Sequence, residues 1–256
     1  MQGKELEIFM RKTARDIRAG QLRVGQRQEI ALSMLMTTWM IACLGKKHVT
    51  VIELGVANGN GLITMITFAE WAKQELDIQM DIYGFDTGTG MPPPMDYRDH
   101  PELWKNGDFA CDVNELLEKI DGQAQLIIGD VKDTIPKFCE TLAASTTHPI
   151  AFISLDLDYY SSTKDAMPLL EMAPEKYLPG VGLHVDDINT QLMYNPWCGE
   201  SLAIQEFNEK HSMRKIHEKS DLYNLQNYHM LHVFDHPLLQ PTAQIKYPIN
   251  CVPFGR

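Results

Sequence analysis

Residues 49–62 read VTVIELGVANGNGL, and this stretch decides the fold. Residues 49–54 form a β-branched, apolar run, which predicts a strand buried inside a parallel sheet. Glycines at positions 55, 59 and 61 follow, and they permit a tight turn that brings the backbone close to a ligand. A helical pattern starts directly after the turn, and its free N–H groups would lie beside that ligand. We interpret the stretch as a cofactor-binding strand, turn and helix; the alternative is an ordinary crossover connection.

The acid at position 53 and the glycine spacing narrow the class of cofactor. The pattern Glu-x-Gly-x-x-x-Gly differs from the Gly-x-Gly-x-x-Gly of a dinucleotide-binding turn, which disfavours a nicotinamide dehydrogenase. An acid at this strand end suits a cationic ligand better than a pyrophosphate. The pattern resembles the first motif of class I S-adenosylmethionine-dependent methyltransferases. The resemblance implies that the cofactor is contacted by Glu53, Gly55, Asn58, Gly59 and Asn60.

Composition and charge exclude several classes of function. The chain has 256 residues, of which 44% are apolar and 22% charged, as in an ordinary globular protein. The net charge of −11 disfavours binding to nucleic acid or to an anionic membrane. The five cysteines are scattered without a Cys-x-x-Cys pair, so neither a zinc site nor a disulfide framework is expected. With no signal peptide and no apolar run of membrane-spanning length, we expect a cytoplasmic protein.

Strands that alternate with helices predict an α/β fold, a doubly wound and mostly parallel sheet with helices on both faces. We expect parallel strands at residues 49–54, 81–86, 124–128, 150–155 and 181–185. A final strand pair, including residues 228–234, fits the antiparallel edge hairpin of class I methyltransferases and brings the sheet to seven strands. Helices are expected at residues 62–75, 113–120, 133–144, 161–172 and 200–210. Residues 1–256 then form a single domain, with N-terminal helices over 1–46, a Rossmann-like core over 47–236 and a tail over 237–256.

Acids stand at the carboxyl ends of all five predicted parallel strands. They are Glu53, Asp86, Asp130, the pair Asp156 and Asp158, and the pair Asp186 and Asp187. Ligands of open α/β sheets bind beyond this edge, so the acids are expected to surround one site. Like charges gathered in this way are costly unless a ligand or an ion compensates them. The clustering therefore indicates a functional site without reference to any family.

Two of these strand ends are candidates for binding the nucleoside part of the cofactor. Asp86, followed by Thr87, can accept hydrogen bonds from a ribose diol; the alternative is a capping or turn acid. In the sequence Gly129-Asp130-Val131, Asp130 could accept from an adenine amino group and Val131 could supply apolar contact. A simple turn aspartate is a nearly equal interpretation of Asp130.

Residues 154–166 read SLDLDYYSSTKDA, and a second acid pair follows at 186–187. Over roughly residues 50–190 the chain resembles the macrocin O-methyltransferase group, which methylates sugar hydroxyls. That group has Asp-Gly-Asp-x-Tyr-x-Ser-Thr and then an Asp-Asp pair; here Leu157 replaces the glycine. In that group acids after these two strands hold Mg²⁺. The resemblance implies Asp156, Asp186 and Asp187 as ligands, with Asp158 in reserve.

Magnesium prefers oxygen ligands and would lower the pKa of an acceptor hydroxyl. Calcium and manganese are alternatives, and so is the absence of any ion, with Asp156 and Asp158 capping the next helix instead. The general base stays open among Asp156, His184 and His100, and we favour Asp156. His184 shares a strand face with Asp186, although a packed core histidine is its more ordinary role. Glu200 could reach the metal or complement a helix dipole.

The sequence thus predicts an S-adenosylmethionine-dependent methyltransferase that acts on a small-molecule hydroxyl with the help of Mg²⁺ or another divalent cation. A sugar, nucleotide-linked or on a natural product, is the acceptor that the resemblance implies, and a homodimer is expected at the level of the family. Either acceptor-pocket or core positions are expected for Trp104, Tyr159, Tyr160 and Trp197. The alternatives are a metal-independent methyltransferase of another acceptor and a non-catalytic protein that binds the cofactor.

Overall fold

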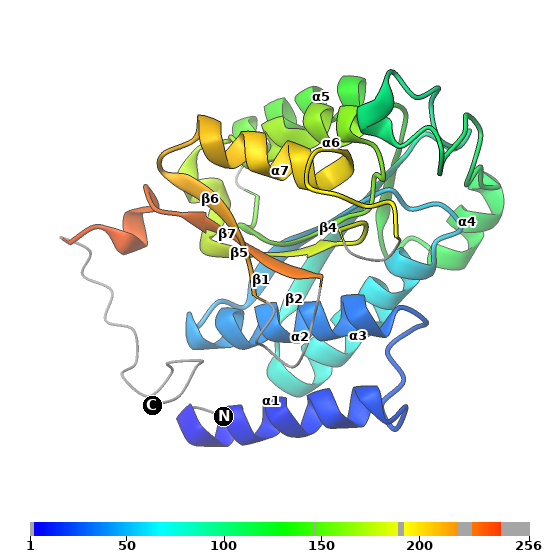
Figure 1. Ribbon diagram of the computed structural model, residues 1–256. Helices are drawn as coiled ribbons and strands as arrows, with labels where there is room; N and C mark the ends of the chain where they lie inside the picture. The colour runs from blue at the N-terminus through cyan, green and yellow to red at the C-terminus, as the bar shows by residue number, and fades with distance from the viewer. Residues whose placement is uncertain (1–2, 146, 189–191, 220–226, 242–256) are drawn as a thin grey trace.

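The computed structural model describes residues 3–145, 147–188, 192–219 and 227–241, and its centre is a seven-stranded sheet (Figure 1). The strand order is β3-β2-β1-β4-β5-β7-β6. The first five strands pair in parallel, whereas β7 is antiparallel to both β5 and β6. The strands are β1 (His48–Leu54), β2 (Gln79–Asp86), β3 (Gln125–Ile128), β4 (Ile150–Leu155), β5 (Tyr177–Val185), β6 (Arg214–Glu218) and β7 (Tyr228–Val233). The predicted α/β fold with an antiparallel edge is confirmed.

Helices cover both faces of the sheet (Figure 1). One face carries α1 (Gly3–Arg18), α2 (Gln28–Cys43) and α3 (Asn60–Leu76), with α4 (Val113–Ile120) beside α3. The other face carries α5 (Val131–Ala144), α6 (Tyr160–Ala166) and α7 (Gly199–Lys210). Successive side chains of β1 point to opposite faces of the sheet, so this strand contributes to both cores. Val49 and Val51 belong to the core beneath α2, and Ile52 and Leu54 belong to the core beneath α5 and α6.

Several element boundaries differ from the sequence prediction. The helix expected over 161–172 is α-helical only to Ala166 and continues as a 3₁₀ turn, Met167–Leu170. Pro168 explains the change, since proline lacks the N–H that an α-helix needs at this position. β5 begins at Tyr177, four residues before the expected start, and α3 begins at Asn60, two residues before. Most of the predicted tail, residues 242–256, lies outside the described residues.

The N-terminal helices belong to the same core as the sheet. α2 is buried on almost every side, because it lies between α1 and the strands. α1 is amphipathic: Leu6, Met10 and Ile17 enter the core shared with α2 and β1, whereas the basic residues of its opposite face are exposed. Within the described ranges, no helix combines the length and the apolar character that crossing a bilayer would require.

Candidate active site

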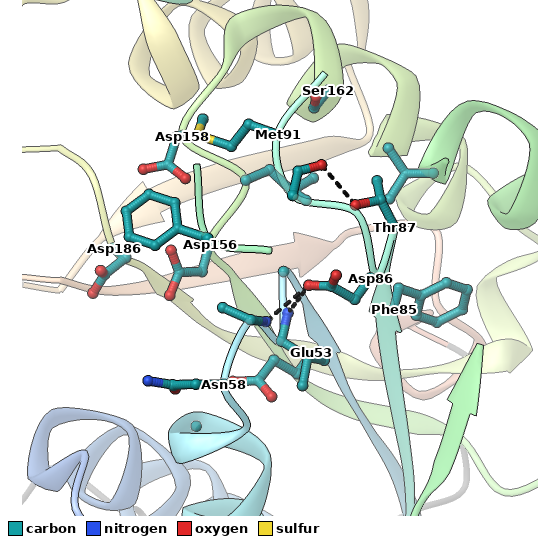
Figure 2. A pocket seen from close by; sticks show the side chains of 18 of the residues that line it. Glu53, Asn58, Phe85, Asp86, Thr87, Met91, Asp156, Asp158, Ser162 and Asp186 are labelled. Atoms are coloured by element: carbon teal, nitrogen blue, oxygen red, sulfur yellow. Dashed lines mark hydrogen bonds between the residues drawn. The ribbon is translucent and has the colours of Figure 1, made fainter. Parts of the chain in front are cut away.

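A cavity of about 470 Å³ lies at the carboxyl ends of the parallel strands. Twelve of the residues that the sequence analysis selected line it: Glu53, Gly55, Asn58, Asn60, Asp86, Thr87, Gly129, Asp130, Val131, Asp156, Asp186 and Asp187. Figure 2 shows Asp156, Asp158 and Asp186 on one side of the cavity and Asp86 and Thr87 on the other. Asp158 and Trp104, which the sequence analysis also considered, line it as well, whereas Gly59, which Leu116 covers, and His184 do not. The expected gathering of acids at this edge is therefore present in the structure.

Glu53 is a fully buried carboxyl group at the floor of this cavity. Only 1% of the residue is exposed, and its Oε2 has no hydrogen-bond partner among the described residues. Burial, and next the nearby Asp156 carboxylate, raises the pKa of Glu53 well above its usual range. An unsatisfied buried oxygen is costly, so this atom suits a ligand that brings a hydrogen-bond donor or a positive charge.

Two glycines of the turn are explained by close contacts within the protein. A Cβ on Gly61 would lie 1.7 Å from Oε1 of Glu53, so any other residue would displace the buried carboxyl group. A Cβ on Gly55 would lie 1.8 Å from the carbonyl oxygen of Asp156, and Gly55 also has a φ of +86°, which disfavours residues with side chains. The glycines thus let the turn after β1 pack tightly against both Glu53 and the loop after β4.

Asp86 holds the cofactor turn in place through backbone hydrogen bonds. Its Oδ2 accepts from the amides of Val56 (3.0 Å) and Ala57 (2.8 Å), and its Oδ1 accepts from Gly88 (2.7 Å). A carboxylate offers about four acceptor positions, so capacity for a ribose hydroxyl is left. The bond from Gly88 matches the alternative of a turn acid, whereas the bonds from Val56 and Ala57 were not foreseen.

The remaining selected residues of the cofactor side combine a local role with a place on the cavity wall. Asp130, for which a simple turn aspartate was the alternative, is the N-cap of α5 and accepts from the amide of Lys132 (3.0 Å). Thr87 donates its hydroxyl to the carbonyl oxygen of Gly90 (2.7 Å). Both residues also line the cavity, so each can contact a ligand in addition to its local hydrogen bond.

On the opposite wall, three carboxylates from two loops form one acidic cluster. Ligand oxygens of Asp156, Asp158 and Asp187 all lie within 4.8 Å of one another. Burial, then the neighbouring Asp186, raises the pKa of Asp156 to about 8. Burial, then a hydrogen bond with Asp187, raises the pKa of Asp158 to about 11. Such buried, mutually repelling oxygens match the hard ligand set of Mg²⁺, Mn²⁺ or Ca²⁺.

The cluster differs by one residue from the ligand set that the resemblance implied. Asp158, the reserve ligand, takes the place expected for Asp186. Asp158 has a left-handed backbone with φ of +57°, which ends the strand alternation and lets the side chain meet Asp187. Asp186 instead forms an ion pair with Arg27 Nη2 (2.7 Å), and its Oδ1 lies 3.2 Å from Nε2 of His184.

Arg27 brings a positive charge into the acidic wall. It precedes α2, lines the cavity, and also lies 3.4 Å from Oδ2 of Asp156 through Nη1. Although burial acts in the opposite direction, the hydrogen bond from His184 and the charge of Arg27 lower the pKa of Asp186. Asp186 is therefore the ionised partner of a guanidinium, while Asp156 and Asp158 are the acids whose charge is less compensated.

Glu200 joins the two acid-bearing loops from behind. Its residue is fully buried, and its carboxyl oxygens accept from the backbone amides of Leu157 (2.9 Å) and Asp187 (3.2 Å). Burial, then the Asp187 carboxylate, raises the pKa of Glu200 well above its usual range. Glu200 therefore lies beside the acidic cluster and fixes the loops after β4 and β5 through these hydrogen bonds. This is more than the complement to a helix dipole that was one of its two expected roles.

Neither histidine considered as a base lines the cavity. His184 is 0% exposed and lies between Ser33 and Asp186, with ring contacts of 3.4 and 3.2 Å. Since an ionised Asp186 can only accept, Nε2 of His184 is assigned as the donor. His100 is 1% exposed and contacts Glu102 Oε1 at 2.9 Å. We therefore reassign His184 from candidate base to a residue that orients Asp186.

The connection between β2 and α4, residues 87–112, forms the outer wall. Asp99, which is 1% exposed, fastens it to α6 by accepting from the amide (2.8 Å) and hydroxyl (2.9 Å) of Ser161. Trp104 of this connection lines the cavity. Tyr159 and Tyr160 are buried, and Trp197 is 68% exposed outside the lining. Of the four aromatic candidates for the acceptor pocket, only Trp104 is in the cavity wall.

Sequence reasoning missed Arg27 and Asp99. Arg27 lies outside any motif and meets its partners only through the packing of α2 against the sheet. Asp99 had one available signal, its place within the long connection, which already suggested a functional segment.

Comparison with known proteins agrees with this geometry. The macrocin O-methyltransferase (TylF) family matches residues 45–223. Among solved structures, the calicheamicin methyltransferase CalS11 is similar, with 21% identity, a TM-score of 0.57, and coverage of 81% of this chain and 80% of that one. The O-methyltransferase NovP has 19% identity, a TM-score of 0.54, and coverage of 78% and 79%. At these identities the two structures show a shared fold. No protein of curated function matches the chain significantly.

Proposed function

Because the chain belongs to the macrocin O-methyltransferase family, it is an S-adenosylmethionine-dependent O-methyltransferase, and we propose that a divalent cation, Mg²⁺ above all, assists it in methylating a small-molecule hydroxyl. The observation that carries the proposal is one cavity with two chemically distinct walls. Glu53, Asp86 and Asp130 form a wall suited to the cofactor. Asp156, Asp158 and Asp187 form a wall suited to a cation.

The cofactor wall matches the polar groups of S-adenosylmethionine. The unpartnered Oε2 of Glu53 can accept from the ammonium group, and Asp86 keeps acceptor capacity for the ribose diol. Val131 and Phe85 add apolar surface for a base. The turn after β1 is fixed by Asp86, so these groups are arranged before the cofactor enters, which lowers the cost of binding.

On the opposite wall, Asp156, Asp158 and Asp187 would hold the cation, which supplies Lewis acidity toward the acceptor hydroxyl when bound. The acceptor oxygen attacks the sulfonium methyl, the carbon–sulfur bond breaks, and S-adenosylhomocysteine leaves. Asp156 is the base that we assign for the hydroxyl proton, because it lines the cavity whereas His184 and His100 do not. Most of the rate enhancement would come from alignment of oxygen, methyl and sulfur by the two walls.

The rim of the cavity favours an acceptor with an apolar body. The connections that flank it expose large apolar side chains to solvent: Met95, Tyr97, Phe109, Leu192, Met193 and Trp197. Exposed apolar side chains in one region indicate a binding surface. A sugar on an apolar natural product therefore suits this rim better than a nucleotide-linked sugar.

One observation favours a metal-independent reaction instead. Arg27 already pairs with Asp156 and Asp186, so a guanidinium supplies part of the positive charge that a metal would provide. In that alternative the same cofactor wall operates, and the acceptor is oriented by Arg27 and by the carboxyl groups of the acidic cluster.

Calorimetric titration distinguishes the two. S-adenosylmethionine and S-adenosylhomocysteine are titrated with Mg²⁺ and then with EDTA, and Mg²⁺ is titrated alone, on the wild type, on Asp187→Asn and on Asp133→Asn. Asp133 is an exposed acid in the first turn of α5 and serves as the matched control. We expect both ligands to bind, and Mg²⁺ to bind to the wild type and Asp133→Asn only.

Each other result has a defined meaning. Binding of the cofactor with no Mg²⁺ signal in the wild type would remove the cation and leave the metal-independent alternative. Failure to bind either cofactor would overturn the assignment of the cavity. A methyl-transfer screen of glycosides with apolar aglycones against nucleotide sugars then tests the acceptor class.

A further inference from the structure

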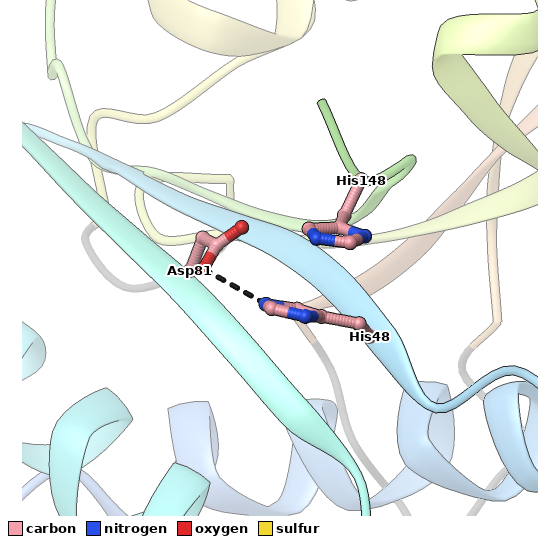
Figure 3. Close-up of side chains that lie close together, drawn as sticks. All are labelled: His48, Asp81 and His148. Carbon is pink, nitrogen blue, oxygen red and sulfur yellow. Dashed lines mark hydrogen bonds and ion pairs between the residues drawn. The ribbon is translucent and has the colours of Figure 1, made fainter. Parts of the chain in front are cut away.

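A second group of metal-ligating side chains lies at the other end of the sheet. His48 is the first residue of β1, Asp81 lies in β2, and His148 lies in the connection before β4 (Figure 3). One ligand atom of each lies within 4.8 Å of the other two. Because β1 has seven residues, roughly 20 Å of strand separates this cluster from the cavity at the carboxyl ends.

We propose that His48, Asp81 and His148 form a binding site for a transition-metal ion of the Zn²⁺ class, distinct from the active site. Two imidazoles and one carboxylate suit Zn²⁺, Cu²⁺, Ni²⁺ or Co²⁺, whereas Mg²⁺ prefers oxygen ligands alone. Three protein ligands with water in the remaining position form an open tetrahedral site. The molecule would then carry two metal sites of different chemical preference at opposite edges of one sheet.

The strands themselves bring two of the ligands together. His48 is paired with Gln79, and Thr50 with Asp81, so His48 and Asp81 are diagonal neighbours on one face of the sheet. His48 Nε2 lies 2.9 Å from Oδ1 of Asp81. A carboxylate in contact with an imidazole fixes the ring orientation in many metal sites and is itself a ligand in others.

The third ligand is positioned by the backbone of β1. The hydroxyl of Thr50 donates to the carbonyl oxygen of His148 (2.8 Å), and the amide of Thr50 donates to that of Pro149 (2.9 Å). The same residue that pairs with Asp81 therefore also fixes the main chain of His148. These bonds place the His148 ring over His48.

The two rings must rearrange to share an ion. They are stacked with centroids 3.4 Å apart and planes 11° from parallel. The lone pair of a ring nitrogen lies in the ring plane, so two parallel rings cannot both point at one ion. We assign the rotation to His148, because His48 is held by Asp81 and His148 lies outside regular secondary structure.

The site is open to an incoming ion. The side chains of His48 and Asp81 are 31% and 39% exposed, and both border a surface cavity of about 310 Å³. The wall of that cavity also carries Glu70 and Lys73, whose opposite charges offset each other. Binding there would connect β1, β2 and the approach to β4, so the ion would stabilise the folded chain by mass action.

Titration with Zn²⁺ in the presence of excess Mg²⁺, which occupies the carboxylate cluster, tests the proposal. The proteins are the wild type, His148→Ala, Asp81→Asn and the control His217→Ala. His217 also belongs to a pair of histidine rings, with His232 at a centroid distance of 6.1 Å, but on the β6–β7 edge. Circular dichroism checks that each variant is folded, and crystals soaked in Zn²⁺ locate the ion by anomalous scattering.

We expect one Zn²⁺ to bind and to raise the melting temperature of the wild type and His217→Ala, with both effects lost in His148→Ala and Asp81→Asn. Replacement by Co²⁺ should give a visible absorption band that depends on His148. Equal Zn²⁺ binding by the wild type and His148→Ala would overturn the proposal, and so would an anomalous peak only at Asp187. Binding of S-adenosylmethionine should not change in either site variant, which separates this test from that of the active site.

Discussion

At the scale of single residues, neighbours decide what each acid of the active site can do. Asp156 and Asp186 follow adjacent strands, yet the pKa of the first is raised and that of the second is lowered. Burial raises the pKa of both carboxyl groups. At Asp186 this effect is outweighed by close contacts with Arg27 and His184, whereas only Arg27, at a longer distance, contacts Asp156. Chemically identical side chains therefore differ in how readily each takes up a proton.

Arg27→Gln should strengthen the binding of Mg²⁺ to the acidic cluster. The guanidinium repels a second cation, and its removal should raise the affinity roughly fivefold to tenfold, about 1 kcal/mol for a partly exposed charge. Calorimetry on the variant, the wild type and Arg23→Gln measures this, since Arg23 is an exposed arginine of the same connection. Weaker Mg²⁺ binding in Arg27→Gln alone would mean that Arg27 organises the site instead of opposing the ion.

His229 should make the folded chain sensitive to acid. Burial lowers its pKa from 6.5 to about 4, although its Nδ1 contacts the carbonyl oxygen of Asn227 at 3.3 Å. Between these two values the unfolded chain binds a proton that the folded chain does not. The free energy of unfolding therefore falls as the pH falls through this window, by about 1.4 kcal/mol per pH unit from this residue alone.

Urea unfolding at about pH 7 and about pH 5 measures this contribution in the wild type, His229→Gln and the exposed control His217→Gln. Over that interval His229→Gln should lose about 2 kcal/mol less stability than the wild type. The effect is confined to pH values below 6.5, where the imidazole of His229 takes up a proton in the unfolded chain only. His217→Gln should behave as the wild type does. An equal loss in all three proteins would show that His229 is accessible to protons in the folded state.

At the scale of elements, the site is held together by acids that bind backbone amides of other elements. α6 begins at its N-cap residue, Tyr159, without a side-chain cap. Instead Asp99 accepts from the first turn of α6 across 62 residues of sequence. Glu200 does the same for the loops after β4 and β5.

Asp99→Asn should release the connection over residues 87–112. The Asp99 carboxylate accepts from the backbone amides of Met95 and Ser161 and from the Ser161 hydroxyl, so a side-chain NH₂ group in its place would face other donors. The loss of these charge-assisted hydrogen bonds costs about 2 kcal/mol. Proteolytic cleavage within the connection should then be about 30-fold faster. Asp96→Asn is the control, because Asp96 is an exposed acid that pairs with Arg98 in the same turn. Equal cleavage of Asp99→Asn and the wild type would contradict the role of Asp99.

At the scale of the whole molecule, local patterns predicted what depends on neighbours in sequence. The run ending in Glu53, the alternation of strands and helices and the gathering of acids follow from periodicity and from the rule that ligands of open α/β sheets bind beyond the carboxyl ends of the strands. The contacts of Arg27 with Asp156, Asp99 with Ser161 and Glu200 with Leu157 span 129, 62 and 43 residues. They depend on helix packing and on the paths of loops, which no local pattern encodes.

The shared core predicts that the N-terminal helices and the sheet unfold together as a single domain. Leu6 is 1% exposed and belongs to the cluster that includes α2, α3 and β1, whereas Ile8 on the same helix is 58% exposed. Leu6→Ala should lower the free energy of unfolding by about 3 kcal/mol through lost burial and a cavity, and Ile8→Ala by less than about 0.5 kcal/mol. Far-ultraviolet circular dichroism during denaturation should show one transition that shifts as a whole in Leu6→Ala. A separate early transition in that variant would instead mean that α1 and α2 form a unit of their own on the sheet.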